Sequence, residues 1–163
     1  MSYKHIFKAS LAWNHPEQPS VVGSKIYTKS HHIAIEGKAD LQVSAAKAFK
    51  GDPVLYNPED LLLSSLISCH MMSYLYVCSK NSIEILSYKD NAIATLETDG
   101  DGSGRFTEVI LHPEVLITDE SQIELALSLH TQANKLCFIA NSCNFTVLHL
   151  SLIHISEPTR RRG

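Results

Sequence analysis

The sequence predicts an α+β fold in which antiparallel strands surround two apolar helices. Two long segments with helical character, residues 57–80 and 119–140, are separated by residues 82–118, whose alternating pattern is typical of strands. Further alternating segments lie before the first helix and after the second. This order of strands, helix, strands, helix and strand differs from the regular alternation that a parallel doubly wound sheet requires.

The first helical segment, NPEDLLLSSLISCHMMSYLYVCSK, is apolar almost all round. Asn57 can cap this helix, Pro58 suits its first position because no N–H is needed there, and Glu59 favours the positive end of the helix dipole. A helix with so little polar surface is expected inside a structure. Cys69 lies near its middle, where a thiol is either inert packing or a protected reactive group.

The second helix is expected to begin at the cap Asp119 and to end at about Ala140. One apolar stripe is traced by Ile123, Leu127, His130 or Thr131, and Asn134. The buried face is expected to be broadened by Leu125, Leu129, Ala133 and Leu136. Antiparallel strands are expected at residues 3–14, 24–37, 82–97 and 105–118, and a closing strand at residues 145–150. The Gly- and Asp-rich segment TDGDGSG predicts a hairpin connection between the third and fourth of these strands.

Charge argues against nucleic acid as a partner. The chain has 163 residues and a net charge of −3. Its last residues, 151–163, resemble the translation of a sequencing adapter, so we interpret residues 1–150 as the domain and the rest as a non-native tail. Without the three arginines and the one glutamate of this tail, 14 basic and 17 acidic residues become 11 and 16, which leaves no basic face for a phosphate backbone.

The remaining composition is that of a globular protein. No segment reads as a convincing membrane span, and the N-terminus lacks the apolar region of a secretory signal, so a cytoplasmic protein is expected. Four cysteines without a C-x-x-C pair favour thiols with individual roles over a disulfide framework. The histidines are scattered without ligand spacing, so neither a metal nor another cofactor is expected.

The cysteines on the two helices are the candidate reactive groups. If Cys69 and Cys137 meet, one sulfur can be oxidised by a peroxide to a sulfenic acid and the other can close a disulfide. Cys78 lies nine residues after Cys69, which places it about 180° around the helix, so we expect it to pack on the opposite face. Cys143 is either filler or a competing thiol. His70 points away from its neighbour Cys69 and is interpreted as a core histidine.

Three segments carry a resemblance to a known family. YNPEDLLLSSLISCHMMSYL, DGDGSGRFTEVILHPEV and HTQANKLCFIANSCNF resemble the osmotically inducible protein C / organic hydroperoxide reductase family over most of residues 5–150. The resemblance implies a thiol-dependent peroxidase that forms an intertwined homodimer. By matching position it implies that Cys69 is the peroxidatic thiol, Cys137 the resolving thiol and Glu59 the carboxylate of the site. Glu59 lies about 15 Å from Cys69 along a regular helix, so it is expected to act through a cation or at the partner protomer's site, or else to be only a favourable charge at the helix start.

The chain departs from the family where an arginine is expected to hold the thiolate. Arg105 is the only arginine before the tail, and it follows a hairpin turn. Lys50 is the residue we match to the family arginine, and Lys29 is a second candidate. A lysine supplies the positive charge that favours a thiolate, but it lacks the planar two-pronged grip of a guanidinium.

Two functions follow as alternatives. The first is reduction of organic hydroperoxides to alcohols, with an external dithiol as reductant and an apolar lining from Leu62, Leu66, Met72 and Phe138 that favours alkyl or lipid peroxides. The second is a non-catalytic dimeric module that binds an apolar ligand between the helices. The missing arginine and the additional thiols make this second function credible.

Overall fold

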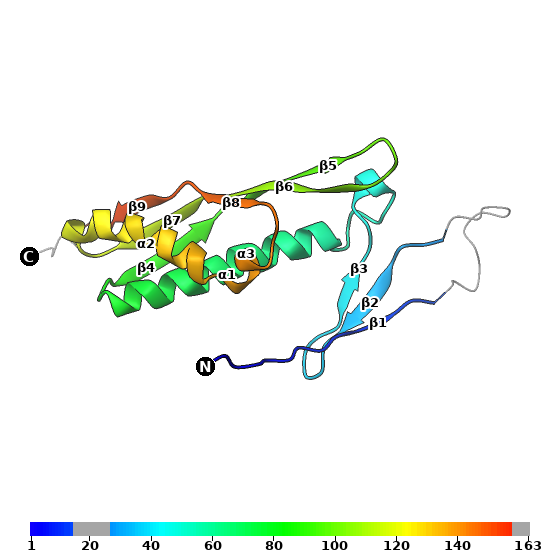
Figure 1. The fold of residues 1–163 in the computed structure, drawn as a ribbon, viewed down its shortest axis with the longest axis horizontal. Coiled ribbons are helices and arrows are strands. Elements are labelled where there is room, and N and C mark those ends of the chain that lie inside the picture. The colour runs from blue at the N-terminus through cyan, green and yellow to red at the C-terminus, as the bar shows by residue number, and fades with distance from the viewer. Residues whose placement is uncertain (15–26, 158–163) are drawn as a thin grey trace, which may run out of the picture. The chain divides into compact units, whose positions relative to one another are not determined.

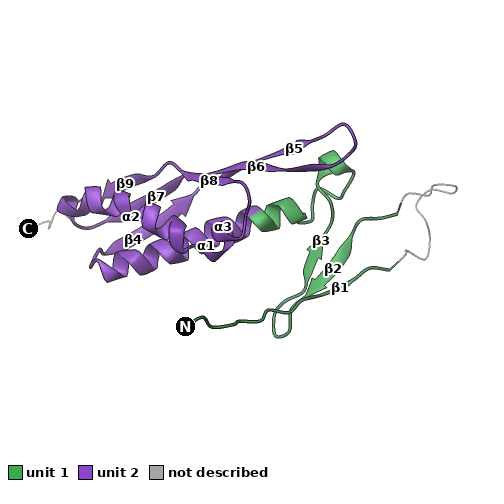
Figure 2. Ribbon diagram, viewed as in Figure 1, with its two compact units in different colours: residues 1–62 green, residues 63–163 purple. Residues whose placement is uncertain are grey.

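The computed structural model describes residues 1–14 and 27–157, and it divides into two compact units (Figure 2). Unit 1 comprises residues 1–62 and unit 2 comprises residues 63–163. The boundary falls within the long helix α1 (Pro58–Lys80). Each unit contains its own strands (Figure 1).

Unit 1 contains a small antiparallel sheet of order β1-β2-β3. Its strands are β1 (Ser10–Ala12), β2 (His31–Ala34) and β3 (Leu41–Val43). The strands predicted at residues 3–14 and 24–37 are therefore confirmed as antiparallel partners, although both are shorter than expected and residues 24–26 lie outside the described chain. The third strand and the short helix η1 (Lys47–Phe49) were not predicted, because their sequence is irregular.

Helix α1 begins where the sequence predicts. The backbone N–H of Asp60 donates to the side-chain oxygen of Asn57 over 2.8 Å, which caps the first turn. The expectation of an enclosed helix holds for one face only, formed by the buried residues Leu66, His70, Tyr74, Val77 and Cys78. Apolar side chains also lie on exposed positions, as Met72 and Tyr76 show at 57% exposure each.

Each of the two long predicted strands of unit 2 is divided into two. Residues 82–97 contain β4 (Ile85–Asp90) and all but the last residue of β5 (Ile93–Thr98). Residues 105–118 contain all but the first residue of β6 (Gly104–Leu111) and all of β7 (Pro113–Ile117). The breaks face each other, because the Asp90 carboxylate accepts the backbone N–H of His112 over 2.8 Å. The strands thereby pass from one sheet to the other.

The two sheets of unit 2 have the orders β4-β7-β9 and β5-β6-β8. The predicted closing strand is confirmed as β8 (Thr146–His149), but it pairs parallel to β6, with Val109 opposite Val147. Strand β9 (Leu152–Ile155) pairs parallel to β7. The sheets are therefore mixed, with antiparallel pairing between β4 and β7 and between β5 and β6. Residues assigned to the tail thus form an edge strand, while their non-native origin stays a prediction.

The predicted second helix is interrupted. It consists of η2 (Glu120–Gln122), α2 (Ile123–Leu136) and α3 (Phe138–Asn141). Asp119 caps its start as expected, by accepting the backbone N–H of Ser121 over 2.9 Å. The predicted stripe was wrong at Leu127, which is 39% exposed. Leu129, His130 and Ala133 are buried as predicted, and Ala126 joins them, whereas Leu125 and Leu136 are exposed.

The core of unit 2 lies between the two helices and the β4-β7-β9 sheet. Figure 1 shows α1 and α2 side by side in this unit. The fully buried members of the core come from α1, α2, β7 and the turn after α1: Tyr74, Val77, Cys78, Ile83, Val115, Ile117, Ala126, Leu129 and Ala133. Side chains of β4 and β9 pack against this cluster. The apolar faces of both helices therefore meet one sheet, as an α+β fold requires.

Candidate active site

Cys69 lies on α1 between the buried residues Leu66 and His70, and it is itself only partly buried. Because successive helical residues are rotated by about 100°, Cys69 lies at the margin of the buried face. Cys69 is therefore less enclosed than Cys137, which is 1% exposed.

Cys137 lies at the break between α2 and α3 and not within a helix, which corrects the prediction that it is near the end of a continuous helix. Its backbone is extended, with φ −70° and ψ 109°. Its sulfur caps α3 by accepting the backbone N–H of Ala140 over 3.4 Å. The side chain is 1% exposed. The helix ends at this residue because an extended backbone cannot continue the helical hydrogen bonds.

The thiols of Cys69 and Cys137 contact each other. Burial raises the pKa of the Cys137 thiol to about 11, and the hydrogen bond with Cys69 adds to this rise. The backbone N–H groups of Ala140 and Ile139 act in the opposite direction, because they stabilise a thiolate. Two sulfurs that are distant in the sequence are thus neighbours in unit 2, and the one at the helix break is held as a neutral thiol at pH 7.

The two other cysteines do not take part in this contact. Cys78 is buried in the core, where it hydrogen-bonds with Tyr74 and where burial raises its pKa. This position agrees with the interpretation of Cys78 as packing. The Cys143 thiol donates to the carbonyl oxygen of Ile139 over 3.2 Å, and it is only partly buried.

The remaining candidate site residues belong to unit 1. One carboxylate oxygen of Glu59 is buried and has no hydrogen-bond partner within residues 1–14 and 27–157. A buried carboxylate oxygen is costly without a partner, so Glu59 has an unused capacity for a cation or an N–H donor.

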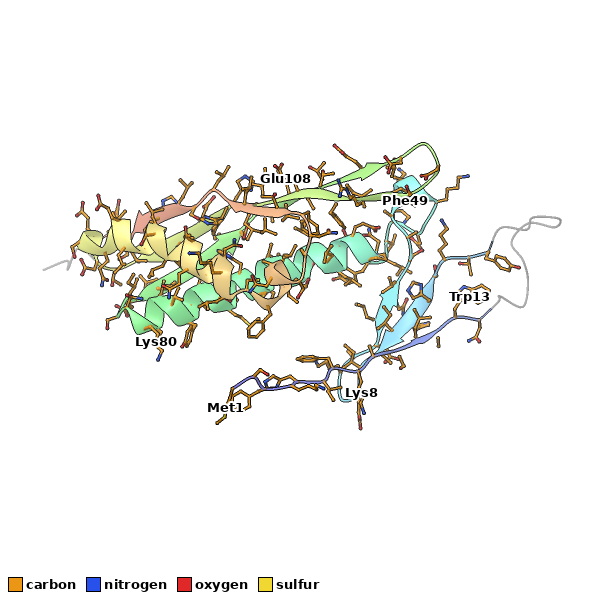
Figure 3. All side chains as sticks on the ribbon, viewed as in Figure 1. Met1, Lys8, Trp13, Phe49, Lys80 and Glu108 are labelled. Atoms are coloured by element: carbon orange, nitrogen blue, oxygen red, sulfur yellow. The ribbon has the colours of Figure 1, made fainter. Side chains whose placement is uncertain are left out.

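Both candidate lysines lie around helix η1. Lys50 ends this helix in the left-handed conformation, with φ 60° and ψ 37°, which is unfavourable for a residue with a side chain. The ammonium group of Lys29 donates to the backbone carbonyl of Phe49, which directly precedes Lys50 and is labelled in Figure 3. Both candidate lysines are therefore associated with the same turn of unit 1: Lys50 ends helix η1, and Lys29 hydrogen-bonds to its last residue.

Unit 2 also contains a histidine cluster that the sequence analysis did not predict. The Nε2 atom of His70 lies 3.0 Å from the Nδ1 atom of His130. The centroid of the His149 ring lies 5.9 Å from that of His70 and 5.8 Å from that of His130. His70 is the core histidine that the sequence indicated. Its partner was recognisable only as an inward position of the second helix, since the two residues are far apart in the chain. Within the described residues, no group of three metal-binding side chains is arranged to hold an ion.

The histidine cluster is neutral around pH 7. Burial lowers the pKa of His70 to about 4, with a further contribution from His149. Burial lowers the pKa of His130 to about 3, and His70 and His149 lower it further. Burial also lowers the pKa of His149 itself. A charged imidazole in this position would lose its hydration without gaining an opposite charge.

A protein-family model described as "OsmC-like protein" matches residues 50–148 of the chain. This range includes both contacting thiols, Glu59 and Lys50. A search of the curated proteins finds no match.

Solved structures share the fold. An OsmC-like protein of unknown function from Vibrio cholerae is 25% identical, with a TM-score of 0.81 over 91% of this chain and 100% of that one. An organic hydroperoxide resistance protein from Elizabethkingia anophelis is 17% identical, with a TM-score of 0.69 over 96% and 100%. The organic hydroperoxide resistance protein OhrB of Bacillus subtilis is 18% identical, with a TM-score of 0.62 over 92% and 98%. The strands and helices of unit 1 and unit 2 therefore follow an architecture that these proteins share.

Proposed function

The chain belongs to the OsmC-like family, and we propose that it is a thiol-dependent peroxidase that reduces organic hydroperoxides to alcohols. The observation that carries this proposal is the contact between the thiols of Cys69 and Cys137. Two solved structures with the same fold are named organic hydroperoxide resistance proteins, which is consistent with this reaction class.

The reaction begins at Cys69, because its thiol is partly exposed whereas that of Cys137 is buried and protonated. The Cys69 thiolate attacks the terminal oxygen of ROOH, the O–O bond breaks, and the alkoxide takes a proton to leave as the alcohol ROH. Cys69 becomes a sulfenic acid. The Cys137 sulfur then forms a bond with the Cys69 sulfur, and the sulfenic hydroxyl leaves as water with the Cys137 proton. An external dithiol reduces this disulfide and is itself oxidised.

The environment of Cys137 suits the second step. Its proton must leave as the disulfide forms, and the N–H groups of Ala140 and Ile139 stabilise the negative charge that develops on sulfur. Until then burial keeps the thiol neutral and protects it from direct oxidation by peroxide, since the thiolate is the reactive form.

A lysine of unit 1 is the proposed cation for the Cys69 thiolate, and Glu59 is the proposed carboxylate that holds this cation. The buried carboxylate oxygen of Glu59 lacks a hydrogen-bond partner within the described residues, and such a group requires a cation or donor. Lys50 is the first candidate, because it occupies an unfavourable backbone conformation of the kind that clusters at functional sites. Lys29 is the second candidate. A lysine in this role gives weaker activity than an arginine would, because it cannot bind two oxygens in one plane.

A homodimer would account for the exposed apolar side chains of unit 2. Met72, Leu75 and Tyr76 follow one another at helical spacing on α1, and all three are exposed in the single chain. By length and composition α1 could also cross a membrane, but core helices of soluble proteins pass the same test. We propose that a second copy of the chain covers this face, in a cytoplasmic protein without a nucleic-acid or membrane partner.

The substrate is proposed to be an alkyl or lipid hydroperoxide. Of the apolar residues that the sequence suggested as a lining, Leu66 is buried in the core, whereas Met72 and Phe138 are exposed, Phe138 at 81%. Phe138 directly follows Cys137, so an apolar surface lies beside the thiol pair and favours a substrate with an apolar body.

The decisive experiment measures consumption of cumene hydroperoxide with a dithiol reductant. Purified wild type is compared with the variants Cys69→Ser, Cys137→Ser and Cys143→Ser. Wild type and Cys143→Ser should turn over repeatedly. Cys69→Ser should be inactive, and Cys137→Ser should accumulate a sulfenic acid that dimedone traps at Cys69. Equal rates for wild type and Cys69→Ser would exclude the peroxidase.

A second function is favoured by one observation. The groups of the described chain that act on the Cys137 thiol are Cys69 and two backbone N–H groups, and none of them is a cation. A non-catalytic dimeric module that binds an apolar ligand between the helices needs no cation at its thiols, so it is consistent with this environment. In that case, iodoacetamide should modify Cys69 at pH 7 no faster than it modifies a free thiol, whereas the peroxidase requires faster modification.

A further inference from the structure

Two buried hydrogen bonds connect α1 to α2. The Nε2 atom of His70 and the Nδ1 atom of His130 are 3.0 Å apart, and the hydroxyl of Tyr74 donates to the backbone carbonyl of Ala126 over 2.9 Å. His70 and Tyr74 are one turn apart on α1, and Ala126 and His130 are one turn apart on α2. The two bonds therefore fix the axial position of one helix against the other, since a slide by one turn of about 5.4 Å breaks both.

These bonds lie in a part of the core from which water is excluded. His70 is 1% exposed, and His130 and Tyr74 are 0% exposed. The ring of Tyr74 stacks on that of His130, with 3.8 Å between centroids. A broken hydrogen bond here would leave buried polar atoms unpaired, so the cost of misplacing either helix exceeds that of a hydrogen bond at the surface.

The same two helices position the thiols. Cys69 directly precedes His70 on α1, and Cys137 terminates α2 two turns after His130. Any change in the axial position or rotation of α1 against α2 moves one sulfur relative to the other. A disulfide forms only over a narrow range of geometry, and a displacement of about 1 Å can cost roughly a hundredfold in a reaction between positioned groups.

We propose that His70 and His130 are positioning residues for the thiol pair, because their hydrogen bond holds α1 and α2 in the register at which Cys69 and Cys137 form a disulfide. This inference deepens the proposed function and concerns its second step. Neither imidazole is assigned a contact with the peroxide or with a reacting sulfur.

The bond also constrains the protons of the two rings. One imidazole donates and the other accepts, so the pair retains one N–H and one lone pair at its outer nitrogens, Nδ1 of His70 and Nε2 of His130. Both outer nitrogens are buried without a hydrogen-bond partner in the described chain. The groups around the pair are Tyr74 of α1 and His149 of β8, and no carboxylate is among those that act on it. While both rings are neutral they must therefore hold the same tautomer, with the proton either on Nε2 of both or on Nδ1 of both.

The test measures disulfide formation without peroxide. In a Cys143→Ser background, the protein is equilibrated with oxidised and reduced dithiothreitol, so that two protein thiols and oxidised dithiothreitol exchange for one protein disulfide and reduced dithiothreitol. Three variants are compared with this background: His130→Phe keeps a ring without nitrogen, His130→Asn keeps an amide near the position of Nδ1, and Tyr88→Phe is a buried control. The Tyr88 hydroxyl is buried without a partner in the described chain, so its removal breaks no bond between α1 and α2.

His130→Phe should lower the equilibrium constant for the disulfide by at least about tenfold, in line with the sensitivity of positioned groups to small displacements. His130→Asn should recover most of this loss, and Tyr88→Phe should leave the constant unchanged. In the background protein, ¹⁵N NMR should detect coupling between Nε2 of His70 and Nδ1 of His130. The positioning role is excluded if His130→Asn behaves like His130→Phe, or if neither variant changes the constant.

Two further comparisons keep the test decisive. If His130→Phe does not fold, His130→Asn is compared with His130→Gln, whose amide nitrogen lies near Nε2 instead of Nδ1 and should not restore the bond. Because dithiothreitol replaces the peroxide, a chain without peroxidase activity can still confirm the positioning role. Conversely, an active peroxidase whose disulfide is insensitive to residue 130 would exclude the role and leave the proposed function standing.

Discussion

The imidazole ring of His130 lies parallel to the phenol ring of Tyr74, with 3.8 Å between their centroids and 7° between their planes. The two residues belong to different helices and are both fully buried. Polar side chains thus occupy the centre of an otherwise apolar interface. Their hydrogen bonds give the helix pair a directional contact that packing of aliphatic side chains alone would not supply.

The Tyr74 hydroxyl is expected to contribute about 1 kcal/mol to the free energy of unfolding, because it donates a buried hydrogen bond to Ala126. Tyr74→Phe should lower the midpoint of urea unfolding accordingly. Tyr88→Phe removes a buried hydroxyl that has no partner in the described chain, so it should leave the midpoint unchanged or raise it. Equal losses for both variants would contradict the contribution of the Tyr74 bond.

Stability should fall on acidification because of the buried histidines. The pKa values of His70 and His130 are lowered to about 4 and about 3, whereas an unfolded histidine titrates near 6.5. Between these values the unfolded chain binds more protons than the folded one, so stability is complete above about pH 6.5 and is lost as the pH falls toward 4.

Each pKa unit corresponds to about 1.4 kcal/mol, so the loss between pH 7.5 and pH 4.5 should be several kcal/mol. Urea unfolding at a series of pH values measures it. A His130→Asn variant should show a shallower dependence on pH. His154→Gln serves as the control, because the side chain of His154 is 55% exposed and lies beside Glu114. A dependence that is the same in all three proteins would show that other groups determine acid stability.

Cys137 should react slowly with iodoacetamide at pH 8 and faster with increasing pH, up to its pKa of about 11. The pH rise converts the neutral thiol into the reactive thiolate. Because the hydrogen bond with Cys69 is one cause of the raised pKa, Cys69→Ala should shift the alkylation profile of Cys137 toward lower pH. Mass spectrometry of the alkylated peptide gives the profile, and an unchanged profile in Cys69→Ala would contradict the contact.

Variants of Lys50 should affect stability and peroxidase activity in opposite directions. Lys50→Gly should stabilise unit 1 by up to about 1 kcal/mol, because glycine adopts a φ of 60° without strain. The same variant should reduce peroxidase activity if the ammonium group assists the thiolate. Lys50→Arg should restore the activity, and Lys29→Met tests the second candidate in the same assay. Full activity of Lys50→Gly would remove Lys50 from the site.

Strand β9 should contribute to stability through one of its faces. Ile153 and Ile155 pack against the core of unit 2, whereas Leu152 is 56% exposed on the same strand. Ile155→Lys should therefore lower the free energy of unfolding by about 2 kcal/mol, since it places a charge where an apolar side chain is partly buried. Leu152→Lys is the matched control and should have little effect. If both are neutral, residues 151–157 do not support the fold, as a non-native tail would predict.

Much of the architecture was predictable from local patterns. The cap at Asn57 and the first helix follow from residues that are neighbours in the sequence, and so do the cap at Asp119 and the start of the second helix. The divided strands were not predictable, because alternation continues through Asn91 and His112 without a break. Only the bond between Asp90 and the backbone of His112 shows where the strands change sheets.

The sequence by itself determined the two helices, the α+β class and the choice of Cys69 and Cys137 as the candidate thiols, since each of these depends on residue type and local spacing. The tertiary structure decided the contact between the two sulfurs, the break in the backbone at Cys137, and the partnership of His70 with His130. The physical reason is range: capping and periodicity act within a few residues, whereas a contact between α1 and α2 depends on how two buried faces fit together across the core.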